Sequence, residues 1–152
     1  MRLLLKTTLL VISIISFSTA CAQQGITTVQ SNYTVEETAN RLENILKENG
    51  ITIFSEIDHQ QGASGVDMEL LPTRLFIVGN PNLGTPIMQC SQTAAIDLPQ
   101  KILIWKNSEG IVQIGYNNPD YLKNRHSITG CNDVLKKIGG ALHNFVSSAA
   151  DG

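Results

Sequence analysis

Two apolar stretches separated by a short polar turn place the strongest constraint on how this 152-residue chain can fold. The stretches are KILIWK at residues 101–106 and IVQIGY at residues 111–116, and the four residues between them are NSEG. Two apolar runs joined by a short turn that contains glycine are typical of an antiparallel β-hairpin. We therefore expect an antiparallel pair of strands at this point in the chain.

An amphipathic helix is predicted directly after Thr34. Thr34 and Glu37 have the spacing of a capping box, in which each side chain accepts a hydrogen bond from the other residue's backbone N–H. Apolar residues then share one helical face, and Asn49 with Gly50 supplies the C-terminal stop. The residues of that face are Val35, Ala39, Leu42, Ile45 and Leu46.

A second helix is predicted over residues 132–147, where apolar residues form one stripe. Gly139 and Gly140 lie inside it, and each costs about 1 kcal/mol relative to alanine, so we expect this pair to allow a close approach to the sheet. Shorter patterns predict strands at residues 26–30, 51–57 and 75–78, and a loop or one helical turn at 58–66. Together these elements predict an α+β fold, a two-layer α/β sandwich whose antiparallel or mixed sheet carries helices on one face.

The stretch GNPNLGTPIMQC at residues 79–90 has the glycine spacing of a phosphate-binding loop. Such a loop needs a lysine after the second glycine, but Thr85 and Pro86 stand there, and proline removes a backbone donor. We interpret the stretch as a turn in which Gly84 adopts an unusual backbone angle before a short helix at residues 85–95.

The N-terminal residues 1–22 have the pattern of a secretory signal peptide. Arg2 and Lys6 precede a short apolar run, and small residues follow it. Two processing routes are open: cleavage after Ala22, or lipidation of Cys21 as in a bacterial lipoprotein. The protein is thus expected to be exported, periplasmic or extracellular, or alternatively a membrane-anchored lipoprotein, with no transmembrane span in the mature chain.

The remaining chain is predicted to hold a short N-terminal segment, residues 23–31, and a single domain, residues 32–149. Over all 152 residues, eleven Lys and Arg residues nearly balance thirteen Asp and Glu residues. No basic stripe is present, so we do not expect a nucleic-acid partner.

A series of short motifs resembles one known family in content and in order. The motifs are NYTVEET, GITIF, IDH, GNP, GTPIM, DLP and YNNP, and they run from residue 32 to residue 119. In this series the chain resembles the domain of unknown function 302 family. The resemblance implies a compact two-layer α/β domain that is often a dimer, and it implies no reaction.

Four residues are predicted to line a small ligand pocket: His59, Met88, Asp97 and Tyr116. His59 follows a predicted strand and matches a histidine of the family, while Asp97 has an alternative role in a turn and Tyr116 in packing. If His59 and Met88 converge, imidazole and thioether ligands would suit copper or haem. His126, in a predicted polar loop, is expected to face solvent.

Cys90 and Cys131 are candidates for a disulfide once Cys21 has been removed with a signal peptide. An oxidising compartment favours their pairing, whereas two separate buried thiols are the alternative.

Two function classes remain open at this point. The sequence contains no hydrolase elbow, no HExxH and no CxxC pattern, which favours a non-catalytic ligand-binding or assembly module. The alternative is a haem- or copper-binding redox or carrier protein that uses His59 and Met88. The cofactor, if any, stays undefined.

Overall fold

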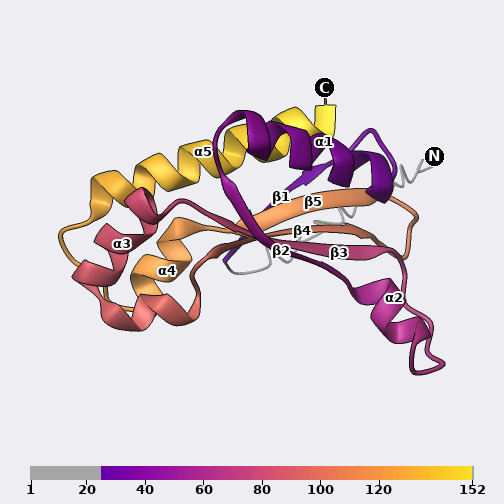
Figure 1. Ribbon diagram of the computed structural model, residues 1–152, viewed down its shortest axis with the longest axis horizontal. Helices are drawn as coiled ribbons and strands as arrows, with labels where there is room; N and C mark the ends of the chain where they lie inside the picture. The colour runs from indigo at the N-terminus through magenta and orange to yellow at the C-terminus, as the bar shows by residue number, and fades with distance from the viewer. Residues whose placement is uncertain (1–24, 152) are drawn as a thin grey trace, which may run out of the picture.

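The computed structural model describes residues 25–151, and the predicted signal peptide and the lipidation site at Cys21 lie outside them. The sheet has five strands in the order β1-β5-β4-β3-β2, and every neighbouring pair is antiparallel. The helices α1 and α5 lie side by side on one face of this sheet (Figure 1). This arrangement confirms the predicted α+β sandwich.

The strands match the sequence patterns closely. They are β1 (Ile26–Gln30), β2 (Thr52–Asp58), β3 (Thr73–Gly79), β4 (Gln100–Lys106) and β5 (Val112–Asn117). The predicted hairpin is β4 and β5, and its turn is held by Asn107, whose Oδ1 accepts hydrogen bonds from the backbone N–H groups of Glu109 and Ile111. Gly110 in this turn has a φ of +83°, which glycine adopts without steric cost.

The helices are α1 (Val35–Glu48), α2 (His59–Ser64), α3 (Pro81–Cys90), α4 (Pro119–Arg125) and α5 (Asn132–Asp151), with a 3₁₀ helix, η1, at Gln92–Ile96. The capping box at Thr34 and Glu37 is present. Apolar side chains of α1 and α5 pack onto the buried face of the sheet, and this core includes Leu42, Leu46, Phe76, Ile102, Ile104, Ile114, Leu142 and Val146.

The stretch after β3 differs from the prediction. The helix α3 begins at Pro81 rather than at residue 85, because Asn80 caps it by accepting a hydrogen bond from the backbone N–H of Asn82. A proline at the first helical position lacks only a donor that would have no helical partner. Gly84 therefore lies inside the helix rather than in a strained turn, and the predicted continuation to residue 95 is the separate η1.

Two further differences concern α4 and α5. The segment before His126, predicted as a loop, forms α4, which Asn118 caps at its N-terminus. A side chain at Gly139 would lie 3.3 Å from the ring of Pro119. The close approach at this glycine is thus to α4, and not to the sheet as predicted.

A disulfide joins Cys90, the last residue of α3, to Cys131, which directly precedes α5. The Cα atoms lie 6.4 Å apart, within the range that a disulfide spans. The bond lies between two helices that contact each other. Within residues 25–151, no helix combines the length and the apolar character needed to cross a membrane.

Candidate functional site

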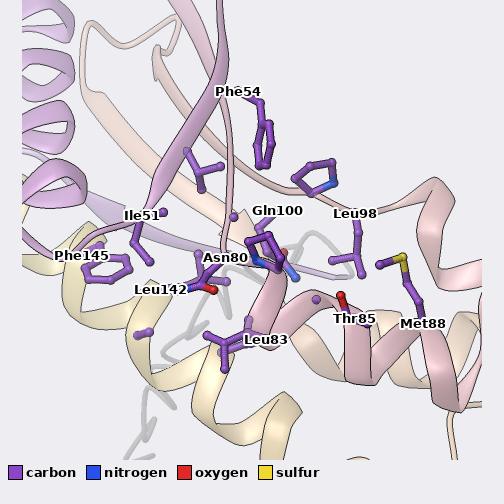
Figure 2. A pocket seen from close by; sticks show the side chains of 17 residues that line it. Ile51, Phe54, Asn80, Leu83, Thr85, Met88, Leu98, Gln100, Leu142 and Phe145 are labelled. Atoms are coloured by element: carbon purple, nitrogen blue, oxygen red, sulfur yellow. The ribbon is translucent and has the colours of Figure 1, made fainter.

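An apolar pocket of about 230 Å³ opens where α3 and α5 meet the ends of β2, β3 and β4 (Figure 2). Among the seventeen described residues that line it, none has a charged side chain. The apolar lining includes Ile51, Phe54, Leu83, Met88, Leu98, Leu142 and Phe145. Such a surface attracts the uncharged, apolar part of a small molecule, because transfer from water into it is favourable.

A β-bulge in β2 positions Phe54 at the rim of the pocket. In β2, Ile53 pairs with Val78 and Ser55 pairs with Ile77, so Phe54 is the extra residue between them. A bulge of this kind turns a side chain away from its regular direction. Phe54 is 54% exposed although it is large and apolar, and its ring lies beside Gly79, where an added Cβ would be 3.4 Å from it. It therefore forms a rim of the pocket.

Gln100 is the buried polar residue of the pocket. It opens β4, pairs with Val78 in the sheet, and is 6% exposed. Within the described part of the chain, neither its Oε1 nor its Nε2 has a hydrogen-bond partner. Figure 2 shows its side chain in the middle of the group of lining side chains. A buried amide without partners costs about 1–3 kcal/mol, and such groups are uncommon in folded proteins.

A second polar group, the Asp97 cluster, lies close to the pocket and consists of Thr93, Asp97, Arg125 and His126. Asp97 Oδ2 accepts a hydrogen bond from His126 Nε2 at 2.6 Å, and its Oδ1 accepts one from Arg125 at 3.1 Å. The other ring nitrogen of His126, Nδ1, forms a hydrogen bond with the Thr93 hydroxyl, 3.2 Å away. The cluster thus bonds η1 to the end of α4.

The Asp97 cluster also fixes the segment that carries part of the pocket wall. Lys101 donates to the carbonyl oxygens of Asp97 and Pro99, at 3.0 and 3.3 Å. Leu98 and Pro99 belong to the segment that these hydrogen bonds hold, and both line the pocket. A hydroxyl, an imidazole and a carboxylate in this order also occur in nucleophilic triads, but Thr93, His126 and Asp97 lie outside the pocket lining. We interpret the cluster as a structural clamp.

The four predicted site residues occupy four different settings. Met88 lines the pocket. Asp97 belongs to its cluster. Tyr116 is 6% exposed in the core, where burial raises the pKa of its phenol and a hydrogen bond with Thr27 partly offsets this. His59 is exposed at the start of α2.

The convergence of His59 and Met88, on which the copper or haem alternative depends, does not occur in this structure. Figure 1 shows α2 and α3 at opposite ends of the sheet, because β2 runs away from the pocket toward α2. Within residues 25–151, no three His, Cys, Asp or Glu side chains gather in a way that could hold a metal ion. His126, predicted to face solvent, has a side chain that is only 6% exposed and bonds to Asp97.

Gln100 was not among the predicted site residues, although the sequence contains a signal for its burial. Gln100, Ile102 and Ile104 alternate along β4 on the buried face, and a period of two is the pattern by which strand residues share a face. A glutamine in this series is therefore expected to be buried.

One family and several curated relatives match most of this chain. The family described as "Domain of unknown function DUF302" matches residues 27–145. Two relatives, from Brucella suis and Brucella abortus and each named "Fluoride-specific ion channel FluC 1", are 39% identical over 113 residues. That alignment covers 74% of this chain but 44% and 42% of the relatives. The chain thus spans less than half the length of these curated relatives.

A solved structure has the same fold. It is described as "Crystal structure of uncharacterized conserved protein DUF302 from Bacillus stearothermophilus". The TM-score is 0.75 at 19% sequence identity, and the match covers 83% of this chain and 98% of the other. Since the identity is low, this similarity supports the fold.

Proposed function

Since the chain belongs to the family described as Domain of unknown function DUF302, for which no reaction is defined, we propose a function from the pocket itself: the domain binds a small, largely apolar molecule without transforming it. The observation that carries this proposal is the apolar pocket, whose lining contains no charged side chain among the described residues. Acid–base chemistry needs a titratable group within hydrogen-bond reach of the reacting atoms. A pocket with this lining supports binding instead.

The size of the pocket sets the size of the ligand. A protein cavity of about 150 Å³ holds benzene, so a cavity of about 230 Å³ suits a molecule of about ten non-hydrogen atoms. Drug-sized ligands occupy pockets of about 300–1,000 Å³. The expected ligands are therefore medium-chain or single-ring compounds.

The experiment measures binding of 1-naphthylamine, an uncharged fluorophore of about eleven non-hydrogen atoms, whose emission shifts to shorter wavelength in apolar surroundings. The native protein should bind it saturably. Ala141→Phe should abolish binding, because Ala141 lines the pocket and a phenyl ring fills much of it. Ala95→Phe is the matched control, since Ala95 is exposed on η1 and outside the pocket lining. Absence of saturable binding to the native protein, or equal binding by both variants, would contradict the proposal.

A second candidate function is assembly of two copies of the chain. Four large apolar side chains are exposed along the segment between α2 and β3: Val66 and Met68 at 66%, Leu70 at 45% and Leu71 at 48%. Exposed apolar groups in close succession are typical of interaction surfaces. Sedimentation of the native protein should give a dimer that Met68→Glu with Leu71→Glu dissociates. A monomeric native protein over the micromolar range would exclude this candidate.

The site of action is proposed to be outside the cytoplasm. The N-terminal pattern of Arg2, Lys6 and an apolar run favours export, and the disulfide between Cys90 and Cys131 is typical of oxidising compartments. Intact-mass measurement should give a chain that begins at Gln23 or a lipid-modified Cys21. Retention of Met1 in a cytoplasmic pool would contradict export.

The alternative of a haem- or copper-binding carrier receives no support from the arrangement of His59 and Met88. A visible spectrum and a metal analysis of the protein purified from its native host would test it. Stoichiometric haem or copper would replace the binding-module proposal.

A further inference from the structure

We propose that the ligand of the apolar pocket is a neutral molecule whose polar end carries a hydrogen-bond donor and acceptor side by side, as in a primary carboxamide, a lactam or an undissociated carboxylic acid. This inference rests on the proposed function and concerns the chemistry of the ligand. The residue that carries it is Gln100.

Gln100 offers both a donor and an acceptor, and both are unused. Its Oε1 and Nε2 lie buried without hydrogen-bond partners in the described part of the chain, and the residue is 6% exposed. A side-chain amide presents its carbonyl oxygen and one N–H along the same edge. A ligand group that matches this edge donates to Oε1 and accepts from Nε2 at once, so a single contact satisfies both atoms.

Among the described residues of the lining, no other polar side chain has buried atoms without a hydrogen-bond partner. The side-chain oxygen of Asn80 already accepts a hydrogen bond from the backbone N–H of Asn82, 2.9 Å away, as the cap of α3. Thr85, the fifth residue of the same helix, is exposed. Gln100 is therefore the residue that forms hydrogen bonds with the polar end of a buried ligand.

The absence of charge in the described lining excludes ionic ligands from this class. A carboxylate or ammonium buried here would lose its hydration without gaining an opposite charge. A carboxylic acid would therefore bind in its protonated form, and its apparent affinity should fall tenfold for each pH unit above its own pKa of about 5.

Three competitors of equal size separate these properties. Octanamide donates and accepts, N,N-dimethylhexanamide only accepts, and octanoate is an anion, and each has about ten non-hydrogen atoms, the size estimated for the pocket. The measurement is displacement of 1-naphthylamine from the mature protein at pH 8. Octanamide should compete about tenfold to a hundredfold better than N,N-dimethylhexanamide, because a buried hydrogen-bonding group discriminates strongly against a ligand that leaves it unpaired. Octanoate should compete about a thousandfold less well than octanamide, because pH 8 lies about three units above the pKa of its acid.

Two variants test whether Gln100 is the cause. Gln100→Leu should bind the fluorophore, lose the preference for octanamide over N,N-dimethylhexanamide, and remain folded. Gln113→Leu makes the same chemical change on β5, outside the pocket lining, and should keep the native preference. In the native protein, octanamide should also shift the side-chain NH₂ resonances that are missing from the spectrum of Gln100→Leu.

The outcomes distinguish this inference from the proposed function. If the fluorophore binds and Ala141→Phe blocks it, but all three competitors act equally on native protein and Gln100→Leu, the ligand class is wrong and the binding function stands. If the native protein binds no fluorophore, both fail. A preference for octanoate at pH 8 would also overturn the inference.

Discussion

The segment from Asp97 to Gln100 begins and ends with a polar side chain, and the two are in opposite situations. Both carboxylate oxygens of Asp97 accept hydrogen bonds, from His126 and Arg125. Neither polar atom of Gln100 has a partner in the described residues, although Gln100 is the more buried of the two. Residue type alone would rank the aspartate as the functional group, whereas unmet hydrogen-bonding capacity points to the glutamine.

The two regions also depend on each other. The Asp97 cluster and Lys101 hold the segment that carries Leu98 and Pro99 into the pocket wall. A ligand that meets a wall already held in place loses less free energy to ordering of the protein. The hydrogen-bonded groups of the Asp97 cluster therefore stabilise the structure around Gln100. Substitutions in each region separate the two contributions.

The largest effect is expected from the disulfide, which ties the pocket helices α3 and α5. Replacing Cys90 and Cys131 by serine opens a loop whose ends are 41 residues apart, and the chain-entropy estimate for the lost stability is about 4 kcal/mol. Denaturant unfolding with and without reductant measures it. Two free thiols in the denatured, unreduced protein would exclude the bond.

Removing the carboxylate of Asp97 should produce the next largest effect. Asp97→Ala leaves the buried His126 ring and the Arg125 guanidinium without their acceptor, and loss of such a partner costs about 3 kcal/mol. Chemical denaturation measures the change. Glu109→Ala, an exposed carboxylate in the hairpin turn, is the control and should stay within about 0.5 kcal/mol. Equal effects of the two variants would show that the cluster is not a clamp.

Gln100→Leu should change stability in the opposite direction. The leucine has similar size and no unpaired polar atoms, so the free energy of unfolding should rise by about 1–2 kcal/mol. Gln113→Leu is the control for the added apolar surface. A loss of stability in Gln100→Leu would mean that the glutamine is hydrogen-bonded in solution, and the contrast with Asp97 would disappear.

The sequence predicted what local patterns determine. The capping box at Thr34 and the glycine-containing turn before Ile111 are complete within a few residues, so α1 and the β4–β5 hairpin were predicted and confirmed. The helix α4 was missed because it is short, although Asn118 and Pro119 form a cap signal. The predicted site combined residues from both ends of the sheet. Contacts between segments that are distant in the sequence decide which side chains meet, and local patterns do not predict such contacts.

A smaller effect is expected from Glu37, a polar group that is satisfied like Asp97 but exposed. The backbone N–H and the hydroxyl of Thr34 both donate to its carboxylate and lower its pKa below the usual 4.5. A carboxyl whose pKa is lower in the folded state stabilises the fold above pH 4.5, and this contribution is lost as the pH falls through the lowered value. Glu37→Gln should remove that part of the pH dependence of stability, measured between pH 3 and pH 7. An unchanged pH profile would contradict the shift.

The smallest effect is expected at His59, which belongs to neither region. It is exposed at the first position of α2, at the end of the molecule opposite the pocket. His59→Ala should therefore change the free energy of unfolding by no more than about 0.5 kcal/mol and leave fluorophore binding unchanged. His126→Ala is the informative counterpart, because the same substitution at a side chain that is 6% exposed removes the donor to Asp97 and should destabilise the fold clearly. If His59→Ala abolished binding while His126→Ala did not alter stability, the ligand site would lie near α2. The difference in hydrogen bonding between Asp97 and Gln100 would then have no connection with ligand binding.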